Sequence, residues 1–284
     1  MTSWLKVPPK KKEDGPPVPR PFFISLQEDE FCSHFNTLFY AHLYAKTNRR
    51  GLVVYDMTTS LSASFPLLQE TFAPVNGVDY ATEMKPSATI LRPKDGQRLG
   101  PVISALTQEN LRLEARRTLT WNPAMLAKIN SVMEENRLSE EYDVGVHIRA
   151  PVRFERARAP TIQTYVDAIQ GVADKLGKSD LSVFVMVDDL GQFEAFAKAV
   201  PKTWVLSTVR PRNSLVRGGR VGTMGRQNPA TKMAAYVEFL TELYCMQRSS
   251  NVICNLSVDT DRFLYLTANA ASLRSLDTPV WTPF

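Results

Sequence analysis

Apolar residues alternate with glycine and polar residues along the segment YDVGVHIR, residues 142–149. A period of two predicts a short strand with one apolar face and one face that ends in His147 and Arg149. Pro151 stops this strand, and a cationic loop follows in which Glu155 is the single carboxylate. Because ligands of open α/β sheets bind beyond the carboxyl ends of the strands, these polar side chains are candidates for a site. The alternative is a solvated loop with a polar residue at a strand end.

The pattern on both sides of this strand alternates between strands and helices. Helices are predicted over about 29–46, from 123 past 133, over 161–176, 192–199 and 230–247, and from about 260 onward. Strands are predicted at 22–24, 51–55, 181–187, 203–206 and 251–254. Prolines and glycines interrupt the pattern between 57 and 113, so no topology is predicted there. Such alternation indicates an α/β fold with a parallel sheet and helices on both of its faces.

The length and composition indicate a globular protein of two domains. The chain has 284 residues, of which 44% are hydrophobic, and this is enough to bury a sizeable core. Residues 1–21 contain six prolines and three consecutive lysines, and are predicted to form a disordered arm. We expect one α/β domain over 22–140 and a second over 141–284.

The sequence also excludes some classes of protein. No apolar run approaches the roughly 20 residues that span a bilayer, and the first residues carry charges and prolines in place of a signal peptide. Cys32, Cys245 and Cys254 lie far apart in apolar surroundings, which favours buried free thiols over disulfides or a metal site. We therefore expect a soluble, cytoplasmic protein.

A loop without acidic residues lies between Ser207 and Asn228. It contains five arginines, Arg210, Arg212, Arg217, Arg220 and Arg226, and the chain as a whole has a net charge of +5. A flexible cationic loop suits an anionic ligand such as a pyrophosphate, or contact with a nucleic acid. The loop has no aromatic residue for stacking on bases, which counts against single-stranded nucleic acid.

Two further strand ends carry polar residues. Asp188 and Asp189 follow the predicted strand at 181–187, where they can hold a divalent metal or accept hydrogen bonds from a base or ribose. Ser257 follows the strand at 251–254 and precedes a helix that carries Arg262, an arrangement that can bind phosphate. Because arginines already supply charge against a phosphate, we favour the interpretation without a metal.

Five motifs then occur in the order found in a known family. They are Trp121-Asn122-Pro123, Val144-Gly145-Val146-His147-Ile148-Arg149, Glu155 five residues before Pro160, Val187-Asp188-Asp189, and Val252 to Ser257 followed by Arg262. On these motifs, over roughly 121–267, the chain resembles the α-1,6-fucosyltransferases and their relatives among the α-1,2- and protein O-fucosyltransferases. The resemblance implies a GT-B-like fold, in which two Rossmann-like α/β domains face a cleft. It places the acceptor side in 22–140 and the nucleotide-sugar side in 141–284.

The resemblance also implies an activity and roles for residues. It implies an inverting, metal-independent transfer of a sugar from a nucleotide sugar to a hydroxyl of a glycan or glycoprotein acceptor, with no cofactor. Arg149 is expected to contact the β-phosphate, and Glu155 is expected to act as the catalytic base. Contacts to the nucleotide sugar are expected from His147, Arg149, Asp188, Asp189, Ser257, Arg262 and Arg220.

Two alternatives remain open at this point. GDP-fucose is the first expectation for the donor, but the family's second arginine is Ala150 here, so UDP-xylose or another sugar nucleotide is the competitor. The second alternative is a basic protein that binds nucleic acid through the loop from Arg210 to Arg226.

Overall fold

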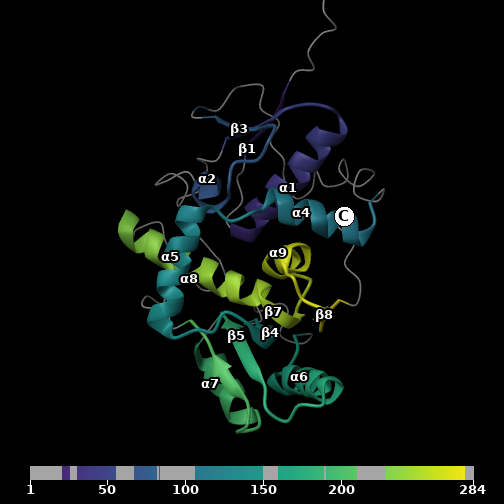
Figure 1. Cartoon of the computed structure of the whole chain (residues 1–284), viewed down its shortest axis with the longest axis vertical. Helices are drawn as coiled ribbons and strands as arrows, with labels where there is room; N and C mark the ends of the chain where they lie inside the picture. The colour runs from purple at the N-terminus through teal and green to yellow at the C-terminus, as the bar shows by residue number, and fades with distance from the viewer. Residues whose placement is uncertain are drawn as a thin grey trace, which may run out of the picture.

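The computed structural model describes residues 21–25, 31–55, 67–81, 83, 106–149, 159–188, 190–209 and 228–278. Within these ranges the chain forms two separate parallel sheets (Figure 1). The first has the order β1-β2-β3, with β1 at Phe22–Ser25, β2 at Leu52–Tyr55 and β3 at Val78–Ala81. Helix α1, Phe31–Thr47, connects β1 to β2, and the short helix α2, Leu67–Thr71, precedes β3.

The second sheet has five strands in the order β6-β5-β4-β7-β8. Their bounds are Tyr142–Ile148 for β4, Ser182–Val187 for β5, Val205–Ser207 for β6, Ser249–Cys254 for β7 and Ser272–Ser275 for β8. Each neighbouring pair is parallel, with β4 between β5 and β7. The prediction of an α/β fold with a parallel sheet in the C-terminal half is therefore confirmed.

Helices cover both faces of the second sheet. Helices α6, Ile162–Leu176, and α7, Leu190–Ala199, lie on one face, where they share a buried cluster with β4 and β5. Helix α8, Pro229–Gln247, packs on β4 and β5 from the other face. Helices α4, Gln108–Thr118, α5, Pro123–Asn136, and α9, Asp259–Thr267, complete the layer between the two sheets (Figure 1).

This middle layer joins the two halves of the chain. Helix α5 packs along α8, while α1 and α4 pack on α9. Aromatic side chains from both halves meet there, with the ring of Phe35 on α1 lying 5.3 Å from that of Phe263 on α9. One buried cluster thus runs from the N-terminal helices into the C-terminal half. The predicted division of the chain at residue 140 stays a prediction.

Local sequence signals account for the helix ends. The Asn122 side chain accepts a hydrogen bond from the Ala124 N–H, and Pro123 stands at the first turn, as predicted. Gly177 ends α6 with a φ of 64°, a left-handed conformation that costs glycine little. Helix α7 begins at Leu190, two residues earlier than predicted. The sequence pattern did not predict α2, β3, α4 or β8.

Gly145 lies in the middle of β4, next to the end of α8 and the start of β7. A Cβ atom at this position would lie 2.6 Å from Ser249 Oγ and 2.9 Å from Met246 Sδ. Because β4 is fixed between two neighbours, we expect Gly145→Ala to lower the free energy of unfolding by about 2 kcal/mol. Urea denaturation measures this change. Gly171→Ala on α6, where a Cβ atom would lie 3.9 Å from a terminal nitrogen of Arg274, is the control and is expected to lose no stability.

Candidate active site

Three parallel strands bring the predicted polar residues to one edge of the second sheet. His147 is on β4 and Arg149 follows it, Asp188 follows β5, and Ser257 follows β7. Because β4 lies between β5 and β7 in a parallel sheet, these strand ends are neighbours. The site is thus built at the carboxyl edge of the sheet, where α9 begins.

His147 forms a buried pair with a carboxylate that the sequence analysis did not select. Its Nδ1 lies 2.7 Å from Oδ1 of Asp261 on α9, and the two side chains are 3% and 0% exposed. On the other side, Nε2 lies 3.6 Å from Oδ1 of Asp188. No residue in the described part of the chain accepts a hydrogen bond from Nε2. This nitrogen is enclosed, and it lies within ion-pair distance of Asp188.

The acidic neighbours decide the charge of His147. Burial alone would lower the pKa of His147, but Asp261 and Asp188 outweigh it and raise that pKa to about 10. Burial raises the pKa of Asp261. Its two oxygens accept hydrogen bonds from His147 and from the backbone N–H of Asn255, and these bonds lower that pKa. Since both oxygens accept hydrogen bonds, we take the pair as ionised at neutral pH. The site then contains an imidazolium in a fixed position.

Asn255 ties the strand ends together. The nitrogen of its side-chain amide, Nδ2, donates to the backbone carbonyl of His147 at 3.2 Å and to the hydroxyl of Tyr165 on α6 at 2.7 Å. The Tyr165 hydroxyl also hydrogen-bonds to the backbone of Arg149, and burial raises the pKa of Tyr165 to about 12. Gln192 donates from its side chain to the Arg149 carbonyl at 3.0 Å. Arg149 is therefore held at both of its backbone polar groups.

Glu242 on α8 adds a second acid that the sequence analysis missed. Burial, together with the nearby charges of Asp188 and Glu238, raises the pKa of Glu242 to about 8, although His147 opposes the shift. At neutral pH this carboxyl group is mostly protonated, so it can donate a hydrogen bond. The site therefore presents a cation at His147, an anion at Asp188 and a protonated acid at Glu242.

The turn after β7 is held by residues around it. The backbone N–H of Ser257 donates to Oδ2 of Asp277 at 3.3 Å, and hydrogen bonds from the Ser257 N–H and hydroxyl help to keep the pKa of Asp277 low despite its partial burial. Arg262 donates from Nε to the Leu256 carbonyl at 3.0 Å and from a terminal nitrogen to Asp259 at 3.0 Å. Arg262 thus stabilises the turn through the Leu256 carbonyl. A phosphate at Ser257 would compete with Asp277 for the hydrogen bonds that Ser257 donates.

Several predicted residues lie outside the described ranges. They are Glu155, Asp189 and Arg220, together with the rest of the arginine loop from 210 to 226. Their assignments stay predictions. Among the residues that are described, no three of the His, Cys, Asp and Glu side chains are grouped so that they could hold a metal ion.

Two other expectations concern the described residues. Cys32, Cys245 and Cys254 are buried free thiols, as predicted. Within the described ranges, no helix combines the length and the apolar character that crossing a bilayer requires.

Comparisons with known proteins add information at the level of structure. No family model matches the chain, and no curated protein matches it by sequence. Solved structures do match. The fucosyltransferase NodZ from Bradyrhizobium is 18% identical and has a TM-score of 0.57, and the match covers 90% of this chain and 96% of that protein.

Two more of these structures were determined in the presence of nucleotide ligands. A NodZ α-1,6-fucosyltransferase soaked with GDP-fucose is 16% identical, with a TM-score of 0.54 over 87% of this chain and 93% of that one. A mutant of FUT1 from Arabidopsis thaliana in complex with GDP is 10% identical, with a TM-score of 0.52 over 89% of this chain and 70% of that one. The chain therefore has the GT-B-like fold of these fucosyltransferases, as the resemblance in its motifs predicted.

Proposed function

We propose that the protein is a glycosyltransferase that takes its sugar from a nucleotide-sugar donor. The observation that carries this proposal is the meeting of His147, Arg149 and Asp188 at the carboxyl edge of β4 and β5, beside the turn at Ser257. In an open α/β sheet this edge is where nucleotides bind. The fold is shared with enzymes whose structures contain GDP or GDP-fucose, which supports the proposal.

The donor that we propose first is GDP-fucose, with UDP-xylose or another sugar nucleotide as the alternative. The side chains near the edge suit a base and ribose as well as a phosphate. Asp188 accepts hydrogen bonds, while a protonated Glu242 donates them. A purine or pyrimidine edge offers both donors and acceptors, so this mixture fits base recognition.

The proposed reaction is a single displacement that inverts the anomeric carbon and needs no metal. The acceptor hydroxyl loses its proton to a base as its oxygen bonds to the anomeric carbon, and the bond to the diphosphate oxygen breaks with the electron pair leaving on the diphosphate. Arg149 and the imidazolium of His147 meet the negative charge that develops there. The acceptor is a hydroxyl of a glycan or glycoprotein.

Glu155 is the proposed base of this step, because it follows the end of β4 by seven residues along the sequence. We expect Glu155→Gln to lower turnover by roughly a hundredfold, since the amide cannot take a proton. Nucleotide affinity should stay near normal, because the change keeps the shape of the side chain. A steady-state assay of nucleotide release and a GDP titration measure the two quantities. Normal turnover in this variant would assign the base to another residue.

The proposal is tested by the melting temperature of the protein with GDP, UDP and a DNA oligonucleotide. A ligand that binds only the folded state raises this temperature in proportion to the logarithm of its concentration. We expect such a rise with GDP and a smaller one with UDP. A rise with DNA alone would contradict the proposal and favour a nucleic-acid-binding protein.

A further inference from the structure

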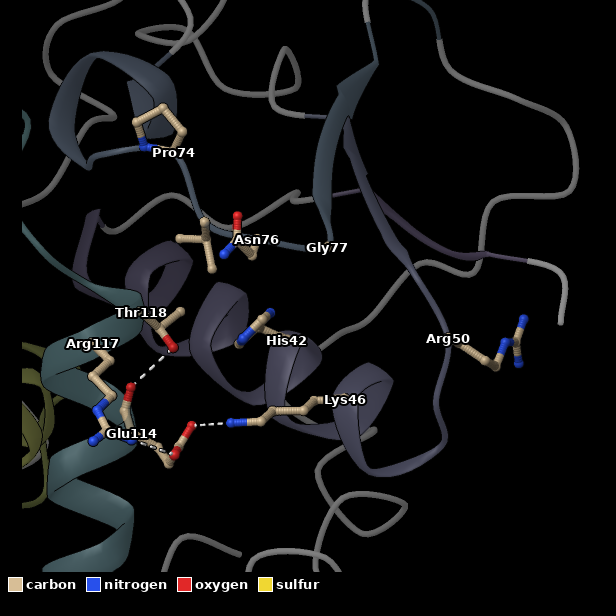
Figure 2. Close-up of a pocket in the computed structure, with 10 residues that line it drawn as sticks. His42, Lys46, Arg50, Pro74, Asn76, Gly77, Glu114, Arg117 and Thr118 are labelled. Atoms are coloured by element: carbon tan, nitrogen blue, oxygen red, sulfur yellow. Dashed lines mark hydrogen bonds and ion pairs between the residues drawn. The ribbon is translucent and has the colours of Figure 1, made fainter. Parts of the chain in front are cut away.

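A cavity of about 530 Å³ lies in the N-terminal part of the fold, away from the edge described above. Its walls come from the end of α1, the last turns of α4 and the turn at 74–77 that leads into β3 (Figure 2). The turn is tied to the first sheet where the Leu52 N–H donates to the Gly77 carbonyl at 2.8 Å. The cavity thus lies at the amino ends of β2 and β3. None of its lining residues belongs to the proposed nucleotide site.

Two cations share one carboxylate at the side of this cavity. Lys46 Nζ lies 2.6 Å from Oε2 of Glu114, and a terminal nitrogen of Arg117 lies 3.4 Å from Oε1 (Figure 2). The hydrogen bond from Lys46 is the main cause that lowers the pKa of Glu114, so this acid is ionised at neutral pH. The side chains of Lys46 and Arg117 are 56% and 66% exposed, against 21% for Glu114. A lysine has three donors and an arginine has five, so one carboxylate does not use them all.

Uncharged polar groups line another part of the cavity. Burial, and then the charge of Lys46, lowers the pKa of His42, so its ring is neutral at pH 7 and offers one donor and one acceptor. The side chains of His42 and Asn76 face each other across the cavity (Figure 2). The hydroxyl of Thr118 donates to the Glu114 carbonyl at 2.9 Å, and its oxygen can still accept. Such paired donors and acceptors suit the hydroxyl groups of a ligand.

The other lining residues, together with the ion pairs, define the size and the net charge of the cavity. Pro74 and Val75 supply apolar surface, while Arg50 points away from the centre of the cavity and donates to the Pro21 carbonyl at 3.1 Å (Figure 2). Lys46 and Arg117 together with Glu114 leave one positive charge in excess at the cavity wall. The volume falls within the range of about 300–1,000 Å³ that is usual for small-molecule sites.

We propose that this cavity binds a small hydroxylated anion of the sugar-phosphate or sugar-acid class. Its phosphate or carboxylate group lies against Lys46 and Arg117, where charge-assisted hydrogen bonds are available. Its hydroxyl groups lie against His42 and Asn76. This site is separate from the proposed donor site, and the ligand is not the sugar nucleotide.

Isothermal titration of the full chain tests the proposal, with glucose 6-phosphate, glucuronate, inorganic phosphate and glucose as probes. We expect saturable binding of glucose 6-phosphate or glucuronate, and the stronger of the two identifies the anionic group. Lys46→Met and Arg117→Met should each weaken it by about tenfold or more. Lys128→Met is the matched control, because Lys128 is 43% exposed and pairs with Glu70 at 3.7 Å outside the cavity. It should bind like the wild type.

The other outcomes contradict the proposal. Binding that Arg149→Ala abolishes and Lys46→Met leaves intact would belong to the nucleotide site. Glucose that binds as tightly as glucuronate would exclude recognition of an anion. No saturable binding of the two sugar anions up to about 10 mM would exclude the site. Melting temperatures of all variants show that they are folded, which is expected because both substituted side chains are largely exposed.

Discussion

Arg149→Ala is expected to lower turnover by about a hundredfold or more, which is the scale lost when one donor to a developing negative charge is removed. As the diphosphate leaves, its oxygens gain charge that fixed cations must meet. The Arg149 backbone is held by Tyr165 and by Gln192, so the side chain starts from a fixed point at the strand end. The loss should fall on kcat more than on KM, because the charge develops in the transition state.

Two further variants sharpen this prediction. Arg149→Lys should recover little of the activity, because an ammonium group cannot form the paired hydrogen bonds of a guanidinium with two phosphate oxygens. Arg116→Ala on α4 is the control, since it removes an equal charge from a helix that lies away from β4. Steady-state measurement of nucleotide release gives both constants. A turnover near the wild-type value in Arg149→Ala would remove Arg149 from the reaction.

Asp261→Asn is expected to lower the free energy of unfolding by about 3 kcal/mol at pH 6.5, because it leaves His147 buried without its charge partner. The pair is 2.7 Å apart and fully enclosed. The amide also replaces the carboxylate oxygen that accepts from the Asn255 N–H at 2.7 Å. Asp259→Asn is the matched control on the same helix, since Asp259 is 28% exposed and pairs with Arg262. It should cost well under 1 kcal/mol.

The pH dependence of this difference has a definite sign. The pKa of His147 is raised in the folded protein to about 10 from an ordinary 6.5, so the stabilisation is complete below pH 6.5 and is lost as the pH rises through 10. The gap in unfolding free energy between wild type and Asp261→Asn should therefore shrink from pH 6.5 to pH 10. Urea denaturation across this range measures it. A gap that does not change with pH would mean that His147 is neutral in the fold.

The sequence predicted the part of the fold that has strong periodic signals. The alternation along β4 and the apolar runs of β5 and β7 set the central strands, and side-chain caps such as Asn122 set helix starts. The edge strand β8 was missed because it is only four residues long, SLRS, and Leu273 is its single apolar residue. Helix α4 was missed because its sequence is mostly polar and its few buried residues give little periodic signal.

The site was predicted in part for similar reasons. His147, Arg149 and Asp188 were found because each stands at or after a strand end, where the position itself indicates a site. Asp261 was missed because an acid in the first turn of a helix is an ordinary stabilising feature. Glu242 was missed because an acid within a long helix normally faces water. Only the packing of α8 and α9 in the fold places Asp261 against His147 and brings Glu242 within its electrostatic reach.

The central claim is that a nucleotide diphosphate binds at the carboxyl edge of β4, β5 and β7. A crystal structure of the protein with GDP tests it most directly. The claim predicts diphosphate oxygens within about 3 Å of the Arg149 guanidinium. It also predicts the base near Asp188 and Glu242, with the Ser257 hydroxyl turned from Asp277 toward a phosphate. GDP bound at another place on the molecule, such as the cavity beside Lys46 and Arg117, would contradict the claim.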